Sequence, residues 1–348
     1  MSELTIAAFT AEIRDPSSRY RIRQYIEPLD KLGIIIDDYY SIIGKYPPVE
    51  KHKRLAWLFS TLVERFKQIQ AYKQKKYDCV ILQREMISTL YTFERLIKHP
   101  YIFDVDDAVH LGKRSGNINS IAKNANSIIC GNEYLANYYG TYHKSVYIVP
   151  TPIDTEKYIP LNNKHKKNRE KITIGWIGTS GNFKFLYLIE KALKQIIDYH
   201  KETTLLIISN ERPAFKEIKE FQYIKWCAET ENSDIQKMDI GLMPLDNSEW
   251  SKGKCSFKML QYMSCGIPVV VSPVGMNLDV LKKGEIGFGP IDYYTDWIDS
   301  LRILINDRSF REARGLEGRK VIEDFYSLDK NAKKLHEIIL NISDNQTK

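Results

Sequence analysis

The sequence lacks several features that would assign the protein to a special class. It has only five cysteines in 348 residues, with no C-x-x-C pair and no histidine at zinc-ligand spacing, so neither a disulfide framework nor a metal site is expected. No apolar run approaches the roughly 18 residues of a transmembrane helix, and Met1-Ser2-Glu3 lacks the basic flank of a signal peptide. Internal repeats and low-complexity tracts are also missing. These absences predict a cytoplasmic globular protein.

The charge balance is moderately basic. The chain has 51 Lys and Arg against 44 Asp and Glu, a net charge of +7, and 43% hydrophobic residues. At about 150 residues per domain, its length predicts two domains that each bury their own core. The positive charge favours anionic partners such as nucleotides or anionic lipids. We expect no nucleic acid partner, because no such binding motif is present and the basic residues are not interleaved with aromatic stacking platforms.

Short β-branched runs alternate with helical periodicity in both halves, which indicates βαβ units and parallel sheets. The polar and basic residues 161–171 have nothing to bury and predict a linker. Domains are therefore expected at residues 1–165 and 166–320, with a helical segment, 321–348, packing back on the first. Strands are expected at Leu4–Phe9, Cys79–Gln83, Tyr101–Val105, Ser127–Gly131, Val146–Val149, Ile172–Ile177, Thr204–Ser209, Ile240–Pro244 and Pro268–Ser272. Helices are expected at Phe185–Tyr199, Phe257–Ser264, Asp296–Ile305, Phe310–Phe325 and Leu328–Ile342.

This alternation predicts an α/β protein with two Rossmann-like domains that face each other across a cleft. Open α/β sheets bind ligands at the carboxyl ends of their strands, so the cleft is the expected active site. In the second domain, the helix Phe257–Ser264 follows a strand and a glycine-containing loop. Its N-terminal N–H groups, with Lys254 and Lys258, would suit a diphosphate. The alternative is that both lysines are only solvated.

The same stretch resembles the nucleotide-sugar site of GT-B glycosyltransferases, particularly the retaining family 4 (group 1) enzymes. Their strand, loop and helix read approximately E-G-F-G-x-x-x-x-E-A-M-A-x-G-x-P-V-V. The matching residues here run from Gly253 to Gln261, continue as Tyr262-Met263-Ser264-Cys265-Gly266-Ile267-Pro268-Val269-Val270, and end at Ser272-Pro273-Val274-Gly275. The layout of the whole chain is also similar, including Ile174–Ser180 at the start of the second domain.

The resemblance implies a metal-independent hexosyltransferase that moves a sugar from a nucleoside-diphosphate sugar to a glycan or lipid-linked acceptor. It implies retention of anomeric configuration by front-face attack, and no cofactor, because the nucleotide sugar is a substrate. Such enzymes often build surface polysaccharides. The alternative is a non-catalytic GT-B-like protein that binds nucleotide or glycan, because both glutamates of the family motif are absent here.

The departures from the family pattern concern the donor side. Gly253 and Gln261 stand where the family has glutamates, and Thr179 stands where it has an arginine. Gln261 could still bind ribose hydroxyls through its amide, and Lys254 would supply the missing cation. The donor-binding residues implied by the resemblance are Gly178, Thr179, Ser180, Lys184, Gly253, Gln261 and Tyr262.

The first domain offers an acceptor side. The segment Phe103–His110 places a group of carboxylates at the end of a strand. We weigh acceptor binding and helix capping equally as the role of these carboxylates, and metal chelation well below both. Arg19, Arg21 and Arg84 are expected on the same rim. The alternative for them is a buried Arg–Glu pair that ties loops together. The predicted catalytic residues are Lys254, Lys258 and Asp106. The predicted acceptor-side residues are Arg19, Arg84, Asp107 and His110.

Residues 51–76 form one further candidate surface. They contain eight Lys or Arg and one acidic residue, Glu64, and their apolar residues recur at helical spacing. Such a basic amphipathic helix could lie on anionic lipid at the inner face of a membrane. The preferred alternative is a helix that packs its apolar stripe on the domain and solvates its charges.

Overall fold

The computed structural model describes residues 3–88, 90–112, 115–161 and 171–344. The chain forms two compact units. Unit 1 comprises Met1–Pro152, Gly253–Cys255 and Leu328–Lys348, and unit 2 comprises Ile153–Lys252 and Ser256–Ser327. The chain therefore passes from unit 1 to unit 2 between Pro152 and Ile153. The predicted linker at 161–171 lies, except for its two end residues, outside the described residues.

Unit 1 is built on a six-stranded parallel sheet of order β2-β1-β3-β4-β5-β6. All five strands predicted for this half are confirmed. The sheet also contains β2, which sequence analysis missed because three isoleucines run directly into two aspartates and show no strand-like alternation. The strands are β1 (Leu4–Thr10), β2 (Ile34–Tyr40), β3 (Cys79–Gln83), β4 (Tyr101–Val105), β5 (Ser127–Cys130) and β6 (Val146–Ile148).

Successive residues of β1 point to opposite faces of this sheet, as the strand period requires. Ala7 and Phe9 join one core, whereas Ile6 and Ala8 join the other. The helices of unit 1 are α1 (Pro16–Arg21), α2 (Ile26–Asp30), α3 (Arg54–Lys73), α4 (Ser115–Asn124), α5 (Glu133–Gly140) and α15 (Leu328–Asp344). Its short helices are η1 (Arg23–Tyr25), η2 (Lys51–Lys53), η3 (Phe93–Leu96) and η4 (Val109–Leu111).

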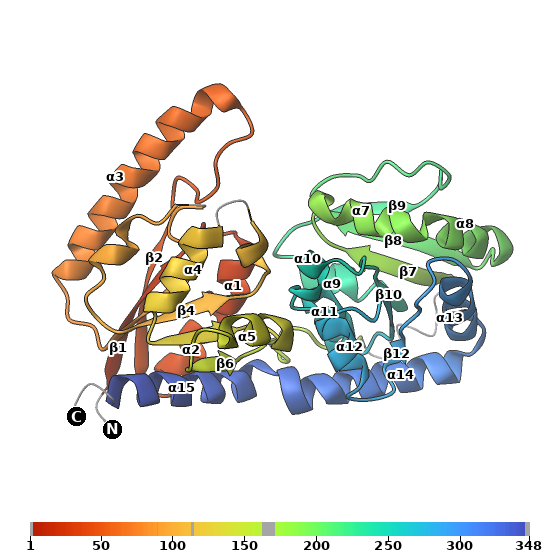
Figure 1. Ribbon diagram of the computed structural model, residues 1–348. Helices are drawn as coiled ribbons and strands as arrows, with labels where there is room; N and C mark the ends of the chain where they lie inside the picture. The colour runs from red at the N-terminus through yellow and green to blue at the C-terminus, as the bar shows by residue number, and fades with distance from the viewer. Residues whose placement is uncertain (1–2, 89, 113–114, 162–170, 345–348) are drawn as a thin grey trace. The chain divides into compact units, whose positions relative to one another are not determined.

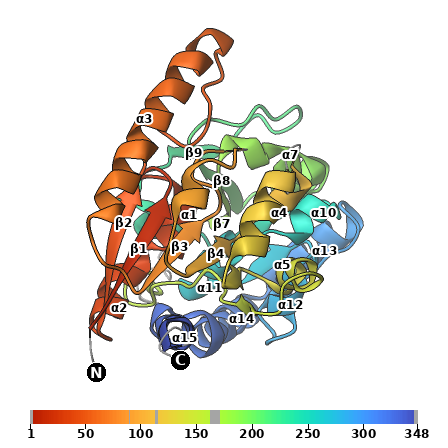
Figure 2. The same cartoon turned by 60° about the vertical axis from the view of Figure 1, so that its left-hand side comes forward.

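The helix α15 completes the second of these cores. It lies beside α2 (Figure 1, Figure 2). Leu335, Ile338 and Ile339 are buried there against residues of β1, β3 and β4. No described helix is both long and apolar enough to cross a membrane.

Unit 2 contains a second six-stranded parallel sheet, of order β12-β11-β10-β7-β8-β9. The four predicted strands are confirmed, and two edge strands were missed: β9 has polar ends and β12 has only two residues. The strands are β7 (Ile172–Ile177), β8 (Thr203–Ser209), β9 (Gln222–Lys225), β10 (Ile240–Met243), β11 (Val269–Val271) and β12 (Gly287–Phe288). Two parallel sheets with helices confirm the predicted α/β class.

The helices of unit 2 include the predicted one at residues 257–264, with the same bounds. The helices expected at 296–305 and 328–342 are found with small shifts at their ends. The one expected at 310–325 ends at Val321 and is continued by a π-helix, and the one expected at 185–199 is divided into three successive helices. The α-helices are α7 (Phe183–Leu186), α8 (Glu190–Tyr199), α9 (Glu231–Ile235), α10 (Glu249–Lys252), α11 (Phe257–Ser264), α12 (Met276–Leu281), α13 (Thr295–Asn306) and α14 (Arg308–Val321). The others are η5 (Ser180–Asn182), η6 (Tyr187–Ile189) and the π-helix η7 (Ile322–Tyr326).

Candidate functional site

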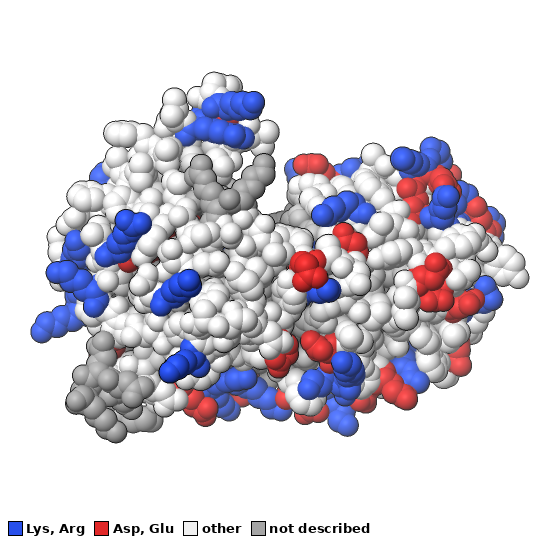
Figure 3. Space-filling view, viewed as in Figure 1, with Lys and Arg blue, Asp and Glu red and all other residues white. Residues whose placement is uncertain are grey.

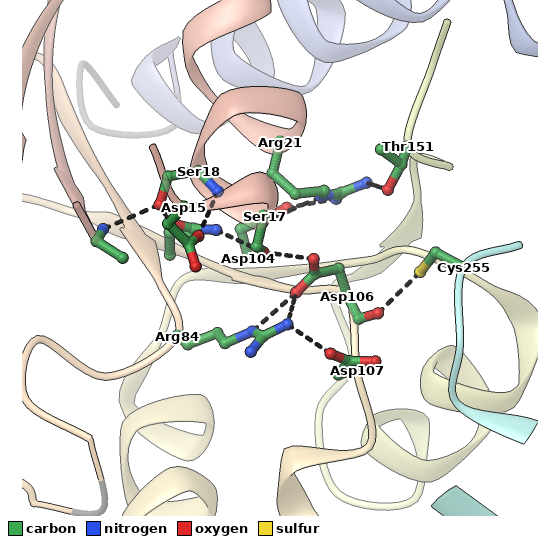
Figure 4. Close-up of polar contacts among 12 residues, drawn as sticks. Asp15, Ser17, Ser18, Arg21, Arg84, Asp104, Asp106, Asp107, Thr151 and Cys255 are labelled. Carbon is green, nitrogen blue, oxygen red and sulfur yellow. Dashed lines mark hydrogen bonds and ion pairs between the residues drawn. The ribbon is translucent and has the colours of Figure 1, made fainter. Parts of the chain in front are cut away.

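The carboxyl ends of three neighbouring strands in unit 1 carry a cluster of polar and charged side chains (Figure 4). Asp106 and Asp107 follow β4, Arg84 follows β3, and Ser17 lies in α1, soon after β1. Since these strands are adjacent and parallel, their carboxyl ends meet at the edge where open α/β sheets bind ligands. We call these four residues the carboxylate cluster.

Arg84 joins the two carboxylates of the cluster. Its Nε donates to Oδ1 of Asp106 at 2.8 Å and its Nη2 to Oδ2 of Asp107 at 2.9 Å. The Ser17 hydroxyl donates to Oδ2 of Asp106. The side chain of Asp107 is 28% exposed, against 12% for Asp106. Asp107 is therefore the more accessible carboxylate.

The surroundings shift the pKa values of these two neighbours in opposite directions. Burial alone would raise the pKa of Asp106, but Arg84 and Arg21 outweigh it and hold that pKa below its usual value. Burial, together with the charge of Asp106, raises the pKa of Asp107, although Arg84 and Lys254 oppose the shift. Neighbouring carboxyl groups whose pKa values are separated in this way are typical of functional sites.

The backbone of Arg84 adopts a left-handed conformation, with φ at 59°. A non-glycine residue in this region costs of order 1–3 kcal/mol and persists where its surroundings hold it. Here the guanidinium is fixed by two carboxylates. The conformation thus turns the chain at the end of β3 so that Arg84 reaches across to β4.

A buried ion pair supports the cluster. Arg21 pairs with Asp104 of β4, and its Nη1 donates to the Val149 carbonyl at 2.6 Å. Both charged side chains are at most 4% exposed. Arg19, predicted on the acceptor side, lies in the same helix with its guanidinium 4.8 Å above the Tyr20 ring. Arg21, expected with Arg19 on this rim, is thus a structural partner of the cluster.

The segment Gly253–Cys255 belongs to unit 1 and contacts this edge of its sheet. The Cys255 thiol donates to the Asp106 carbonyl at 3.0 Å, and the Asn132 amide donates to the Lys254 carbonyl at 3.1 Å. A Cβ on Gly253 would lie 2.6 Å from the Cβ of Ala108, so the segment packs too closely there for any side chain. The space that a glutamate side chain would need at this position is therefore filled by Ala108.

His110, also predicted on the acceptor side, lies in an aromatic group. It is buried and stacks on Tyr138 with ring centroids 3.7 Å apart. Tyr139 meets the same imidazole edge to face. This position gives His110 a clear packing role.

In unit 2, the turn after β7 lies against α11 and brings Gly178, predicted to bind the donor, next to Lys258, predicted to be catalytic. A Cβ on Gly178 would lie 2.6 Å from Cε of Lys258 and equally close to the Trp176 ring. The stem of Lys258, from the first turn of α11, therefore lies directly on the Gly178 backbone. The next residues of the turn are held locally: Thr179 accepts from Asn182, and the Ser180 N–H donates to Asn210 at 2.8 Å.

Lys184 is exposed in α7 and lies close enough to Asp246 to contribute to lowering that carboxyl's pKa. Burial opposes this effect, and hydrogen bonds from Ser248 and Ser251 are the main causes of the lowering. Asp246 follows β10, so Lys184 faces the carboxyl edge of the second sheet. Sequence analysis did not single out Asp246, although its position after a strand was a usable signal.

The start of α11 is shaped by a left-handed residue. Ser256 has φ at 51° and no side-chain capping bond, because its hydroxyl donates to Asn277 at 2.6 Å. The serine thus fixes the loop to α12. The first turn of α11 carries Lys258.

Gln261 and Tyr262 lie in the interior of unit 2. The Gln261 amide donates to the Tyr158 hydroxyl at 3.1 Å, and that hydroxyl donates to Glu231. Tyr262 accepts from the Ile177 N–H at 2.9 Å. Gln261 is 2% exposed and Tyr262 is fully buried. The ribose contact expected for Gln261 stays a prediction.

In the described part of the chain, no group of three or more His, Cys, Asp or Glu residues could hold a metal ion. Residues 171–307 match the family model of the group 1 glycosyltransferases. The matching segment runs from the start of β7 to the end of α13, and it contains both Gly178 and Lys258. No curated protein matches the chain in sequence.

Solved structures resemble the protein over nearly its whole length. Sucrose-phosphate synthase from Thermosynechococcus elongatus matches with a TM-score of 0.74 and 14% identity, covering 98% of this chain and 99% of that one. Anabaena HepE in complex with UDP and glucose gives 0.71 and 11%, covering 97% and 99%. The glycosyltransferase WaaG, which is involved in lipopolysaccharide biosynthesis, gives 0.65 and 12%, covering 97% and 99%. The predicted GT-B fold is thereby confirmed.

Proposed function

We propose that the protein transfers a hexose from a nucleoside-diphosphate sugar to a glycan or lipid-linked acceptor, with retention of anomeric configuration. The observation that carries this proposal is the Lys258 stem lying on Gly178, inside the segment that matches group 1 glycosyltransferases. Only a glycine leaves room for this stem, which places Lys258 beside the carboxyl end of β7, where open α/β sheets bind ligands and where an ammonium group could pair with a diphosphate.

In the proposed reaction, the bond between the anomeric carbon and the donor phosphate oxygen breaks while the acceptor oxygen bonds to the same face of that carbon. The acceptor proton passes to a donor phosphate oxygen. Negative charge grows on the leaving diphosphate, so Lys258 and Lys184 of unit 2 would stabilise the transition state more than the bound donor. The role of Lys254 as a further cation stays a prediction from the sequence. The chemistry requires no metal if these cations neutralise the diphosphate.

On the acceptor side, we assign hydroxyl binding to the carboxylate cluster. Asp107 is its more exposed member and has the raised pKa. Asp106 already accepts hydrogen bonds from Arg84 and from the Ser17 hydroxyl. An acceptor hydroxyl would have to displace Ser17 to bind Asp106, so Asp107 is the better candidate for direct contact.

Two of the structural relatives support the finer parts of this proposal. HepE was solved with UDP and glucose, which supports a uridine-based donor. WaaG acts in lipopolysaccharide biosynthesis, which supports a lipid-linked acceptor in surface polysaccharide synthesis at the inner face of the membrane.

A panel of sugar nucleotides tests the proposal. We expect one donor to raise the melting temperature most and to be slowly hydrolysed to nucleoside diphosphate by the purified protein. NMR of the transferred sugar would then report its anomeric configuration. Donor binding without any turnover, with every acceptor class offered, would favour the non-catalytic alternative.

A further inference from the structure

Unit 1 exposes large apolar side chains where the chain enters α3. Figure 1 shows α3 (orange) reaching beyond the sheet of unit 1, with its N-terminal end uppermost. Around this end, Val49 is 88% exposed, Leu55 81% and Phe59 71%. We call residues 49–59 the α3 tip. Single exposed apolar residues are ordinary, but three within eleven residues form a patch that needs an explanation.

Packing on the domain does not account for these side chains. The buried residues of α3 are Thr61, Arg65, Ile69 and Tyr72, and they define the face that the helix turns to unit 1. Leu55 and Phe59 are four apart and thus share a different face. Apolar residues therefore also lie on a side of α3 that does not pack on unit 1. The expectation that the whole apolar stripe packs on the domain is wrong for Leu55 and Phe59.

The charge of the α3 tip is mainly positive. Lys51, Lys53 and Arg54 are exposed there, and Figure 3 shows Lys and Arg side chains at the corresponding end of the molecule. The one acidic residue of residues 49–59, Glu50, pairs with Lys53 at 3.3 Å. The Arg54 guanidinium also bonds the Val49 carbonyl at 3.3 Å, which holds the apolar and basic parts of the tip together.

We propose that the α3 tip docks on an anionic phospholipid surface. Val49, Leu55 and Phe59 enter the interfacial region, while Lys51 and Lys53 stay at the level of the headgroup phosphates. A lipid surface fits better than a second copy of the chain, because two tips would bring like charges together, whereas anionic headgroups attract them. The α3 tip contains neither the carboxylate cluster nor Gly178 and Lys258, so the inference does not depend on the transfer reaction.

Co-sedimentation of the full chain with lipid vesicles tests the inference. We expect binding to vesicles of equal parts phosphatidylglycerol and phosphatidylcholine, and little binding to phosphatidylcholine alone. Salt should weaken the binding because it screens surface charges beyond about 8–10 Å. No donor or acceptor is present, so the result is independent of whether the proposed transfer reaction occurs.

Variants at exposed positions separate the charged and apolar contributions. Replacing Lys51 and Lys53 by Gln should weaken binding about thirtyfold, since each basic residue near an anionic surface contributes about a fivefold change. Leu55→Ser should weaken it roughly tenfold. The matched apolar control is Ile291→Ser, because Ile291 in unit 2 is 80% exposed. The charge control is the replacement of Lys191 and Lys201, both exposed in unit 2, by Gln.

Insertion can be observed directly at the tip. Four of the five cysteines are buried and Cys227 is exposed, so Leu55→Cys in a Cys227→Ser background places an environment-sensitive fluorophore at one site. We expect a blue shift with anionic vesicles, and none for the same label at Ile291→Cys.

Equal binding to neutral and anionic vesicles, or control variants that weaken binding as much as the tip variants, would overturn the proposal. The absence of binding would overturn it as well. If Leu55→Ser instead abolished a dimer measured by light scattering and left vesicle binding unchanged, the occupant of the surface would be a second copy of the chain.

Discussion

Replacement of Lys258 by methionine tests the charge of this side chain separately from its packing. The stem of Lys258 covers the backbone of Gly178, where a Cβ would come within 2.6 Å of Cε. Methionine keeps most of that apolar stem but removes the ammonium group. We therefore expect the packing on Gly178 to be kept, and any loss of unfolding free energy to be that of the contacts of the ammonium group alone.

The expected loss of activity is much larger. One cation facing the charge that develops on a leaving diphosphate contributes about 3 kcal/mol to the transition state, so Lys258→Met should slow turnover roughly a hundredfold. The assay is release of nucleoside diphosphate from the best donor of the panel, with urea unfolding measured on the same samples. A companion variant, Lys254→Met, should also lose turnover.

The matched control is Lys282→Met, because Lys282 is exposed and its ion pair with Asp279 is long, at 4.0 Å. It should leave both turnover and stability unchanged. Turnover of Lys258→Met within about twofold of the unmodified protein would refute the reasoning, because the ammonium group would then not face the diphosphate. A large loss of stability would mean that the charge mainly holds the fold.

Three further outcomes are expected. Asp106→Asn should lower the unfolding free energy at pH 7 by about 2–3 kcal/mol, because Arg84 loses a buried partner. Since the pKa of Asp106 is lowered, the difference in unfolding free energy between variant and unmodified protein should shrink as the pH falls through that pKa. Urea unfolding across a pH series measures this difference. Gly275→Ala should cost about 3 kcal/mol in the same assay, because φ is +54° there and a Cβ would meet the Lys252 carbonyl oxygen at 2.5 Å; an unchanged urea midpoint would contradict this. A chelator should leave sugar transfer unchanged, and loss of activity that Mg²⁺ restores would count against the charge-only mechanism.

Much of the fold could be predicted because buried parallel strands are apolar and β-branched along their whole length. The run Cys79–Gln83, for example, is buried at every position, and its bounds are predicted without error. The strand Gln222–Lys225 lies at an edge of its sheet and has two exposed residues. Its pattern is therefore that of a loop, and only pairing with a distant neighbour makes it a strand.

The candidate site was less accessible to sequence analysis. The rule that ligand-binding residues follow strands correctly located Asp106 and Arg84 at one edge of a sheet. The left-handed backbone of Arg84 and its two carboxylate partners could not be predicted, because they depend on the spacing of strands in space. The interior position of Gln261 was also missed, since its hydrogen-bond partner Tyr158 lies about a hundred residues earlier in the chain.

Unit 1 is built from chain segments that are far apart in the sequence, and this limits when the unit can finish folding during synthesis. Its last helix, α15, is made after all of unit 2, yet Ile339 is fully buried in a core that it shares with β1. At about 5–20 residues per second, roughly ten to forty seconds separate the synthesis of Pro152 from that of the end of α15. During this interval, the part of this apolar face that α15 will cover is exposed, although Ile22, Tyr25 and Leu29 already pack on the same core. A nascent chain of this protein should therefore need a chaperone, or a temporary partner, at its N-terminal half long after that half has left the ribosome.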